Sequence, residues 1–437
     1  MRDGGRLSAA MEILADIETR RRPVQDALKD WGLTHRFAGS RDRNAIGNLV
    51  YDVLRRKASF GALMGSDAPR PLVLATYALG WGRGVDGLLA ACDPGDRHAP
   101  APPEARELSA IRSTTLPADT PDHVRADLPE WLMADFRRAL GADVVEEGRA
   151  LADRAGIDLR VNSLKASRPA VLEALAPLGA TPTPYAPLGL RLPAGTADDK
   201  APQVTAEFAY KRGEIEIQDE GSQIAAAIAA VGGAGLAVDL CAGGGGKSLA
   251  LAAAFAGAGR IYAYDNDKRR FGDIFDRIAR SGAANIDVVE PAAGDSLAFL
   301  DATADLVVVD APCTGTGTWR RRPDAKWRLA PGALDMRLKQ QAEVLARAAR
   351  LVKPGGRIVY VTCSLLPQEN EDQITAFLGR DRRFRLADTA ALWPEALGVP
   401  LPDGLRLELS GGTALRLTPR RCGTDGFFIA RLDRQAG

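Results

Sequence analysis

Two cysteines, Cys313 and Cys363, have the clearest capacity for chemistry in this chain. Each directly follows a short apolar run, 306–309 and 357–361 respectively, that predicts a buried parallel strand. In an open α/β sheet, reacting groups collect at the carboxyl ends of the strands. A lone cysteine is more often a small buried hydrophobe, but two thiols brought to one sheet edge indicate covalent cysteine chemistry in which the second sulfur assists.

A glycine-rich loop at 239–248 joins another expected strand to a helix. Consecutive glycines let backbone N–H groups approach a ligand and leave a helix N-terminus pointing at anionic groups. A P-loop requires glycine where this chain has Cys241, so that pattern misses by one residue. A dinucleotide fingerprint starting at Gly243 would require glycine where Ser248 stands. The third alternative is a site for a methyl donor.

Acidic residues at four expected strand ends favour the methyl donor. Asp239 lies in the glycine loop, Asp265 ends the second strand, Asp295 follows the third and Asp310 follows the fourth. Asp265 is placed to accept hydrogen bonds from ribose hydroxyls, and Asp295 to hold an adenine amino group. Each aspartate alone is more often a turn or helix cap. Together they suit S-adenosylmethionine, whose sulfonium is cationic, better than a triphosphate.

The elements that must position these residues lie in three regions. Residues 213–437 alternate short apolar runs with helical stretches, which predicts a Rossmann-like, doubly wound, mostly parallel α/β sheet. Residues 145–212 predict a small α/β subdomain with strands near 159–162 and 188–192. Residues 1–140 show helical periodicity and predict an all-α domain. The expected strands of the large sheet are 236–240, 260–264, 286–289, 306–309 and 358–361.

Composition limits the class of protein. A net charge of +1 over 437 residues means that any nucleic-acid surface must come from local clustering. The five cysteines are scattered without a CxxC pair, which argues against a disulfide framework or a metal site and for a reducing compartment. Neither a secretory signal nor a long apolar run is evident, so we expect a cytoplasmic protein, monomeric and not bound to membranes.

Beyond these patterns, the chain resembles the Sun/RsmB family of RNA cytosine-C5 methyltransferases, most of all the bacterial RsmB type that acts on 16S ribosomal RNA. The clear resemblance covers 210–437. Residues 160–162 resemble the start of the family's small RRM-like RNA-binding subdomain, and residues 40–56 resemble the NusB-like helical domain of the bacterial type. The matching segments are 218–223 (QDEGSQ), 239–248 (DLCAGGGGKS), 310–317 (DAPCTGTG), 362–364 (TCS) and 424–428 (TDGFF).

The glycine loop departs from the family in one respect. The family loop usually reads Cys-Ala-Ala-Pro-Gly-Gly-Lys, whereas Gly243 and Gly244 replace the second alanine and the proline here. Because glycine loosens a free loop, we expect a lower cofactor affinity, although the Gly-Gly-Lys core at 245–247 persists.

The resemblance implies roles for individual residues. It implies S-adenosyl-L-methionine as cofactor, Cys363 as nucleophile, Cys313 as the group that assists proton removal and product release, and Asp310 as a contact for both the cofactor and N3 of the base. DNA cytosine methyltransferases use a Pro-Cys cysteine as nucleophile, which would swap the cysteines; the sequence at 362–364 favours Cys363. Lys247 is expected to meet the donor's carboxylate or Asp310. The implied cofactor-binding residues are Cys241, Ala242, Gly243, Gly244, Gly245, Gly246, Lys247, Asp265, Asp295 and Asp310.

The substrate is expected to be RNA, with ribosomal RNA, free or in an assembling small subunit, as the first choice. A basic run at 320–322, followed by Lys326, Trp327 and Arg328, combines cations for phosphate with an aromatic ring able to stack on a base. All three histidines lie before residue 124, so the base must be a carboxylate, a thiolate or water. Three rivals stay open: a tRNA methyltransferase, an RNA-dependent ATPase and a non-catalytic RNA-binding assembly factor.

Overall fold

A computed structural model describes residues 1–197 and 202–436. The chain forms two compact units. The first contains Met1–Ala155, Ala194–Ala201 and Trp319–Leu329, and the second contains Gly156–Pro193, Pro202–Thr318 and Ala330–Gly437. No helix in the described part of the chain is both long and apolar enough to cross a membrane.

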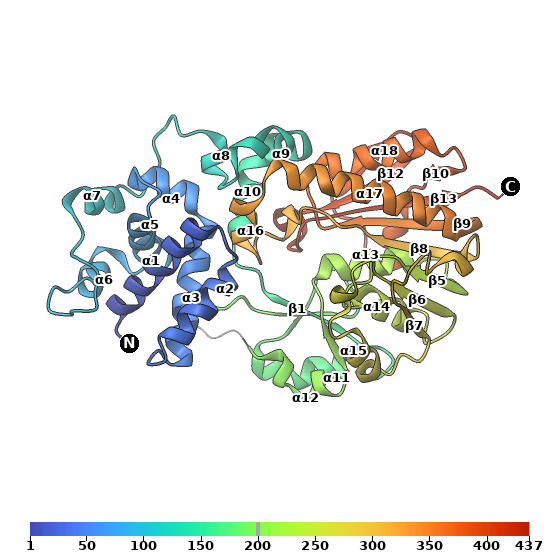
Figure 1. The fold of residues 1–437 in the computed structure, drawn as a ribbon, viewed down its shortest axis with the longest axis horizontal. Helices are drawn as coiled ribbons and strands as arrows, with labels where there is room; N and C mark the ends of the chain where they lie inside the picture. Colours follow the sequence, from blue (N-terminus) through green and yellow to red (C-terminus); the bar gives the residue numbers. More distant parts are fainter. Residues whose placement is uncertain (198–201, 437) are drawn as a thin grey trace. The chain divides into compact units, whose positions relative to one another are not determined.

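The first unit is helical (Figure 1). Apolar side chains at helical spacing close its core, as the sequence predicts: Leu7, Ile13 and Ile17 of α1 pack with Leu49 and Val53 of α3. Its resemblance to a NusB-like domain stays a prediction. The helices are α1 Asp3–Arg20, α2 Val24–Thr34, α3 Ser40–Arg55, α4 Lys57–Met64, α5 Pro69–Ala75, α6 Gly84–Ala91, α7 Ala105–Ser113, α8 Asp122–Arg125, α9 Met133–Leu140, α10 Val144–Ala152 and α16 Pro323–Arg328.

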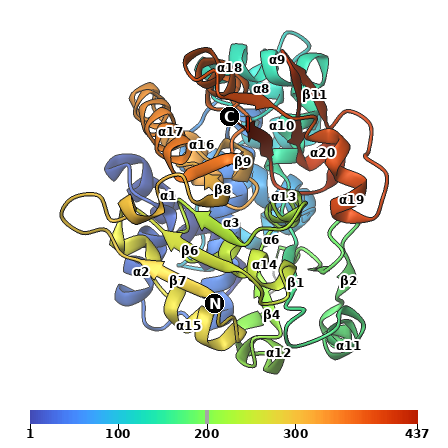
Figure 2. The same ribbon diagram turned by 90° about the vertical axis from the view of Figure 1, so that its right-hand side faces the viewer.

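The second unit contains two sheets. The smaller is antiparallel, with the order β2-β3-β1-β4. Its strands are β1 Ile157–Val161, β2 Thr181–Pro182, β3 Gly189–Leu192 and β4 Ile215–Ile217, and helices α11 Arg168–Ala174 and α12 Phe208–Lys211 accompany them. The larger has the order β11-β12-β13-β9-β8-β5-β6-β7, with β10 paired to β13. In Figure 2, β9, β8, β6 and β7 follow one another down this sheet.

All five predicted strands of the large sheet exist and are parallel to one another. They are β5 Leu236–Asp239, β6 Arg260–Tyr264, β7 Ile286–Val289, β8 Ala304–Asp310 and β9 Val352–Thr362. The expectation of a mostly parallel sheet is wrong, because four antiparallel strands extend it beyond β9. These are β10 Phe384–Leu386, β11 Arg406–Leu409, β12 Gly412–Leu417 and β13 Phe427–Arg434. The sheet is therefore a mixed, Rossmann-like sheet.

Helices cover both faces of the large sheet, as the continuous apolar strands require (Figure 1). Leu306 and Val308 pack in one core with α13 and α14, whereas Val307 and Val309 pack in a second core with α17 and α18. Alternate residues of one strand thus serve opposite faces. The helices of this unit are α13 Glu220–Ala230, α14 Gly246–Ala254, α15 Ile274–Ser281, α17 Pro331–Leu351, α18 Glu371–Arg380, α19 Trp393–Leu397 and α20 Pro419–Cys422.

Candidate active site

The two strand-end cysteines meet. Strands β8 and β9 are paired in parallel with Asp310 opposite Val361, so the loops that follow them leave the sheet side by side. Cys313 Sγ and Cys363 Sγ lie 3.4 Å apart, within hydrogen-bond distance for sulfur. The sequence prediction that both thiols reach one edge of the sheet is confirmed by this geometry.

The pair is electrostatically asymmetric. The hydrogen bond to Cys363, then burial, raises the pKa of the Cys313 thiol well above its usual range. Cys313 therefore favours its neutral thiol form, and either sulfur can donate the hydrogen bond that joins the pair.

A buried carboxylate that the sequence analysis missed braces both cysteine loops. Glu369 is fully buried and accepts hydrogen bonds from the Thr314 backbone N–H at 2.8 Å and from the Thr314 hydroxyl. Gln341 Nε2 donates to the same carboxylate at 3.0 Å. The next residue, Asn370, donates to the Ser364 carbonyl at 2.9 Å. The signal was present as two polar residues, Glu-Asn, shortly after the second cysteine in a segment that becomes buried.

Lys247 joins the glycine loop to the end of β8. Its ammonium donates to Asp310 Oδ2 at 2.7 Å, which confirms one of the two contacts expected for this lysine. The Lys247 side chain is only 6% exposed. Burial disfavours the ammonium, but the charges of Asp310, Asp239 and Cys363 outweigh burial and raise the pKa of Lys247. A permanent cation is therefore fixed next to the Cys363 sulfur.

Two glycines with left-handed backbone conformations and a hydrogen bond to Asp265 set the shape of the glycine loop. Gly243 and Gly245 have φ of +49° and +78°, a conformation that side chains disfavour. The Gly243 N–H donates to Asp265 Oδ2 at 3.1 Å, and the Asp265 side chain is 1% exposed. A Cβ on Gly245 would lie 2.8 Å from Ile274 of α15, so this loop passes too close to the helix for any other residue.

Asp295 lies in a different environment from the other aspartates. Its carboxylate is bonded by Arg347 at 2.8 Å and by Arg350, both from α17. The bond from Arg347, then the Leu297 backbone N–H, lowers the pKa of Asp295 to about 2. Arg347 also donates to the Tyr264 hydroxyl at 3.0 Å. This aspartate is thus tied to α17, whereas Asp265 and Asp310 contact the loop and its lysine.

The remaining cysteines are not set up for chemistry. Burial raises the pKa of Cys241 and of Cys92 and Cys422 alike, so each behaves as a neutral packing residue. In residues 1–197 and 202–436, no cluster of three or more histidine, cysteine or acidic side chains is placed to hold a metal ion. Cysteine chemistry therefore concentrates on Cys313 and Cys363.

Only part of the basic segment after Cys313 is buried: Arg322 and Arg328 are exposed, whereas Lys326 is buried and Trp327 is half-buried. Lys326 is 1% exposed and donates to the Arg55 carbonyl at 3.0 Å, and Trp327 Nε1 donates to the Leu54 carbonyl at 2.6 Å. Arg320 is 8% exposed. The expectation of a cationic and aromatic RNA surface at Lys326 and Trp327 is therefore wrong, because α16 docks on α3 through these side chains.

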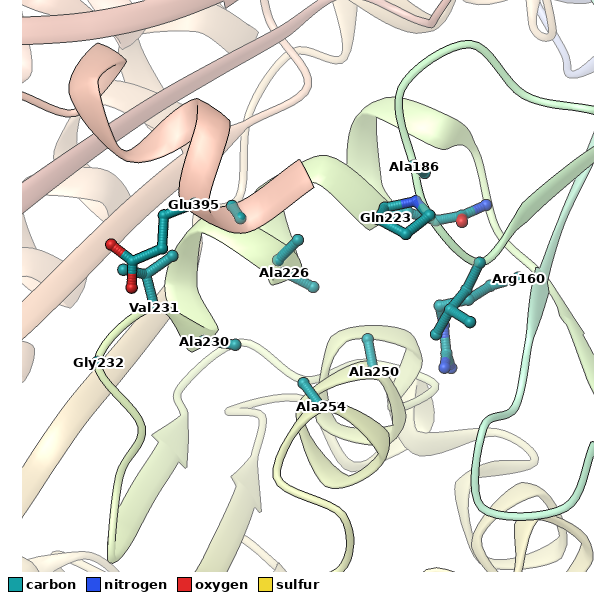
Figure 3. Close-up of a pocket in the computed structure, with 14 residues that line it drawn as sticks. Arg160, Ala186, Gln223, Ala226, Ala230, Val231, Gly232, Ala250, Ala254 and Glu395 are labelled. Atoms are coloured by element: carbon teal, nitrogen blue, oxygen red, sulfur yellow. The ribbon is translucent and has the colours of Figure 1, made fainter. Parts of the chain in front are cut away.

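A cavity of about 330 Å³ lies elsewhere, between α13, α14 and α19 (Figure 3). Alanines such as Ala226, Ala230 and Ala250 form most of its wall, with Arg160 and Gln223 at one end (Figure 3). None of the predicted site residues lines it. This cavity is thus separate from the cysteine pair, and the chemistry of the residues identifies the candidate active site.

Comparisons with known proteins identify the family of this chain. The family described as 16S rRNA methyltransferase RsmB/F matches residues 232–433, and the ferredoxin-like domain of RsmF/B-like methyltransferases matches residues 128–197. A probable ribosomal RNA small subunit methyltransferase B of Synechocystis is 29% identical over 97% of this chain and 98% of its own length. A ribosomal RNA small subunit methyltransferase B of Sodalis glossinidius is 31% identical over 73% of this chain and 69% of its own.

Solved structures give the same result. The crystal structure of PH0851 covers 99% of this chain and 98% of that protein, with 26% identity and a TM-score of 0.71. A methyltransferase homologue from Pyrococcus horikoshii covers 72% of this chain and 97% of that protein, with 26% identity and a TM-score of 0.57. The glycine loop is thus the loop of a methyltransferase and not of a P-loop ATPase. The chain belongs to the RsmB/F family of 16S rRNA methyltransferases.

Proposed function

We propose that this protein transfers a methyl group from S-adenosyl-L-methionine to C5 of a cytosine in 16S ribosomal RNA, through a covalent bond between Cys363 and C6 of the base. The observation that carries the proposal is the 3.4 Å contact between Cys313 Sγ and Cys363 Sγ. The names of the relatives, which are small-subunit rRNA methyltransferases, support the choice of RNA.

The residues around the glycine loop fit the cofactor. S-adenosylmethionine supplies an electrophilic methyl group on a cationic sulfonium, and Asp239, Asp265 and Asp310 place negative charge around the loop. We propose that the Asp265 carboxylate accepts hydrogen bonds from the ribose hydroxyls, in place of its present bonds from the Gly243 N–H and Arg270. The backbone of residues 241–246 and Lys247 would hold the methionine end. Asp295 stays our proposed contact for the adenine amino group.

Cytosine C5 needs activation before it can accept a methyl group. When a thiolate adds to C6, the electrons of the C5–C6 double bond make C5 enamine-like and nucleophilic. The pKa of Cys313 is raised, which favours its neutral thiol, so we assign this addition to Cys363, as the resemblance to the family implies. Because the charge of Cys363 raises the pKa of Lys247, Lys247 in return stabilises the Cys363 thiolate.

We propose that Asp310 contacts both Lys247 and the substrate base. Its Oδ2 is bonded to Lys247, and its side chain remains 36% exposed at the strand end. Addition of the thiolate at C6 makes N3 of the flipped-out base basic enough to take up a proton. We propose that the exposed part of the Asp310 carboxylate then accepts a hydrogen bond from this N3–H. Lys247 then keeps Asp310 oriented between the base and the cofactor.

Cys313 completes the reaction. Once the Cys363 sulfur is bonded to carbon, the hydrogen bond and charge that raised the pKa of Cys313 are gone, so Cys313 can release its proton to solvent. The resulting thiolate takes the proton from C5, the C5–C6 double bond reforms, and Cys363 leaves as a thiolate. Atoms balance: one methyl group enters the base and one proton leaves to solvent.

The test compares wild type, Cys363→Ala and Cys313→Ala, with Cys422→Ala as the matched control for loss of a buried thiol. Each is incubated with labelled S-adenosylmethionine and either 16S rRNA lacking the modification or tRNA transcripts. We expect 5-methylcytosine in 16S rRNA with wild type and Cys422→Ala, none with Cys363→Ala, and a denaturant-resistant protein–RNA adduct with Cys313→Ala. An adduct from Cys363→Ala would reverse the two roles, and label only in tRNA would replace the substrate.

A further inference from the structure

The glycine loop lacks the proline that usually stiffens the family loop, so something else must hold it. Position 244 is glycine, and residues 243–246 are four consecutive glycines. Such a run has a large conformational entropy to lose on ordering. In the structure, Arg277 of α15 reaches this run, and its Nη1 donates to the Gly244 carbonyl at 2.5 Å.

Arg277 is itself fixed from the other side. Its Nε and Nη2 donate to Glu216 Oε2 at 3.1 and 2.9 Å. Glu216 belongs to β4 of the small sheet and its side chain is 3% exposed, while that of Arg277 is 14% exposed. Arg280, one helical turn further, donates to the other Glu216 oxygen at 2.8 Å. Both arginines thus share one buried carboxylate, and Arg277 also donates to the glycine loop.

We propose that Arg277 is a positioning residue for the cofactor loop and takes over the role of the missing proline. It clamps the Gly244 carbonyl so that the N–H groups of residues 243–246 and Lys247 are aimed before the cofactor arrives. This proposal rests on the proposed use of S-adenosylmethionine. The clamp would offset the flexibility of the extra glycines, which the sequence analysis expected to lower cofactor affinity.

A side chain at 244 would displace the Arg277 guanidinium from its contact with the loop. A Cβ built on Gly244 would lie 2.8 Å from Arg277 Nη1, closer than such atoms approach. The φ of Gly244 is outside the left-handed region, so its sign does not bar proline. A proline ring therefore competes with the guanidinium for the same space, and the two solutions to loop flexibility are alternatives.

The first experiment compares Arg277→Gln with Arg280→Gln. Both lose an ion pair with Glu216, but only Arg277→Gln also loses the charged bond to the loop. We expect Arg277→Gln to raise the Kd and KM for S-adenosylmethionine about tenfold, with kcat at saturation kept, whereas Arg280→Gln stays near wild type. Arg277→Lys, which keeps a cation, should recover part of the loss.

A second readout needs no cofactor. Hydrogen exchange of the peptide that contains 242–247 is measured in the ligand-free proteins, and we expect faster exchange in Arg277→Gln but not in Arg280→Gln. Equal behaviour of the two variants would overturn the inference. If wild type binds no S-adenosylmethionine but the exchange difference is present, the proposed function fails and the positioning role stands.

The third arm tests the exclusion. Gly244→Pro is introduced into wild type and into Arg277→Ala. We expect the proline to weaken cofactor binding in wild type, where it meets the guanidinium, and to strengthen binding in Arg277→Ala, where it restrains a free loop. The same sign of effect in both backgrounds would contradict the proposal.

Discussion

Lys247 and Lys326 are two nearly fully buried lysines, one in each compact unit. Lys247 is 6% exposed and lies in the active site, and Lys326 is 1% exposed on α16. An aspartate with a raised pKa lies near each of them: Asp239 near Lys247, and Asp127 near Lys326. In sequence alone both lysines are candidates for ligand binding.

The pKa values of the two lysines shift in opposite directions because the lysines have different bonding partners. Burial disfavours the charge of both lysines, but Asp310 bonds Lys247 at 2.7 Å, and the pKa of Lys247 is raised. Lys326 donates to the Arg55 backbone carbonyl, and burial lowers its pKa to about 8. The attraction of Asp127 does not compensate for burial and for the neighbouring charges of Arg55 and Arg56. A buried cation thus becomes a permanent charge where a carboxylate bonds it directly, and a structural hydrogen-bond donor where one does not.

The largest expected effect comes from removing each ammonium in turn. Lys247→Met leaves Asp310 without its cation and Cys363 without its stabilising charge, so methyl transfer should fall by about two to three orders of magnitude. Lys326→Met should leave the Kd for S-adenosylmethionine within about twofold, because its contacts lie in the other unit. Isothermal titration and single-turnover methylation measure both. Comparable loss of cofactor binding in the two variants would end the distinction.

At alkaline pH the two lysines should change the free energy of unfolding in opposite directions. The pKa of Lys326 is about 8 when folded against 10.5 when unfolded, so the unfolded chain binds more protons in between. The free energy of unfolding of the first unit should therefore rise between pH 8 and 10.5, by up to about 3 kcal/mol, from this lysine. The raised pKa of Lys247 contributes stability that is present below its unfolded pKa of 10.5 and lost as pH rises through its folded pKa.

Tryptophan fluorescence during urea unfolding measures this difference. The first unit holds the tryptophans Trp31, Trp81, Trp131, Trp319 and Trp327, and the second holds Trp393. Subtracting the profile of Lys326→Met from that of wild type removes the titration of cysteines and tyrosines, which both proteins share. A wild-type profile that runs parallel to the Lys326→Met profile would show that the ammonium is not desolvated.

The sequence predicts the half of the sheet whose signal is local. Each of the five parallel strands is a short apolar run, and each run lies where a strand forms. The antiparallel strands were missed for different reasons. Strand β11 is half exposed and β10 has three residues, whereas β13 is placed by its pairing with β9, β10 and β12. Pairing partners distant in sequence leave no periodic trace.

The residues of the candidate active site also divide into those that the sequence predicts and those that it does not. Cys313, Cys363 and Asp310 follow strands directly, so strand order alone brings them to one edge. Glu369 and Arg277 act through loops and helices whose position depends on tertiary packing. The sequence marks Glu369 weakly, through the Glu-Asn pair at 369–370, and does not mark Arg277. Lys326 misled for a related reason: a cation beside an aromatic residue looks like an RNA contact until the packing of α16 on α3 buries it.

The smallest expected effect concerns Asp239, a carboxylate near Lys247 that Lys247 does not bond directly. Burial, then the charge of Asp310, raises the pKa of Asp239 from 3.8 to about 6, and its Oδ1 has no hydrogen-bond partner among the described residues. A raised acid pKa means that the folded protein binds the extra proton, so this group lowers stability as pH rises from about 4 to about 6.

Asp239→Asn keeps a side-chain oxygen that can accept from Ser248 and should remove that loss, worth somewhat under about 3 kcal/mol at pH 7. Urea unfolding followed by Trp393 at pH 4.5 and 7.5 measures it, and parallel profiles for the two proteins would mean that Asp239 is ionised throughout. Since Asp310 still bonds Lys247 in this variant, cofactor binding should weaken far less than in Lys247→Met, which makes the direct bond, rather than the number of nearby carboxylates, the feature that distinguishes the two lysines.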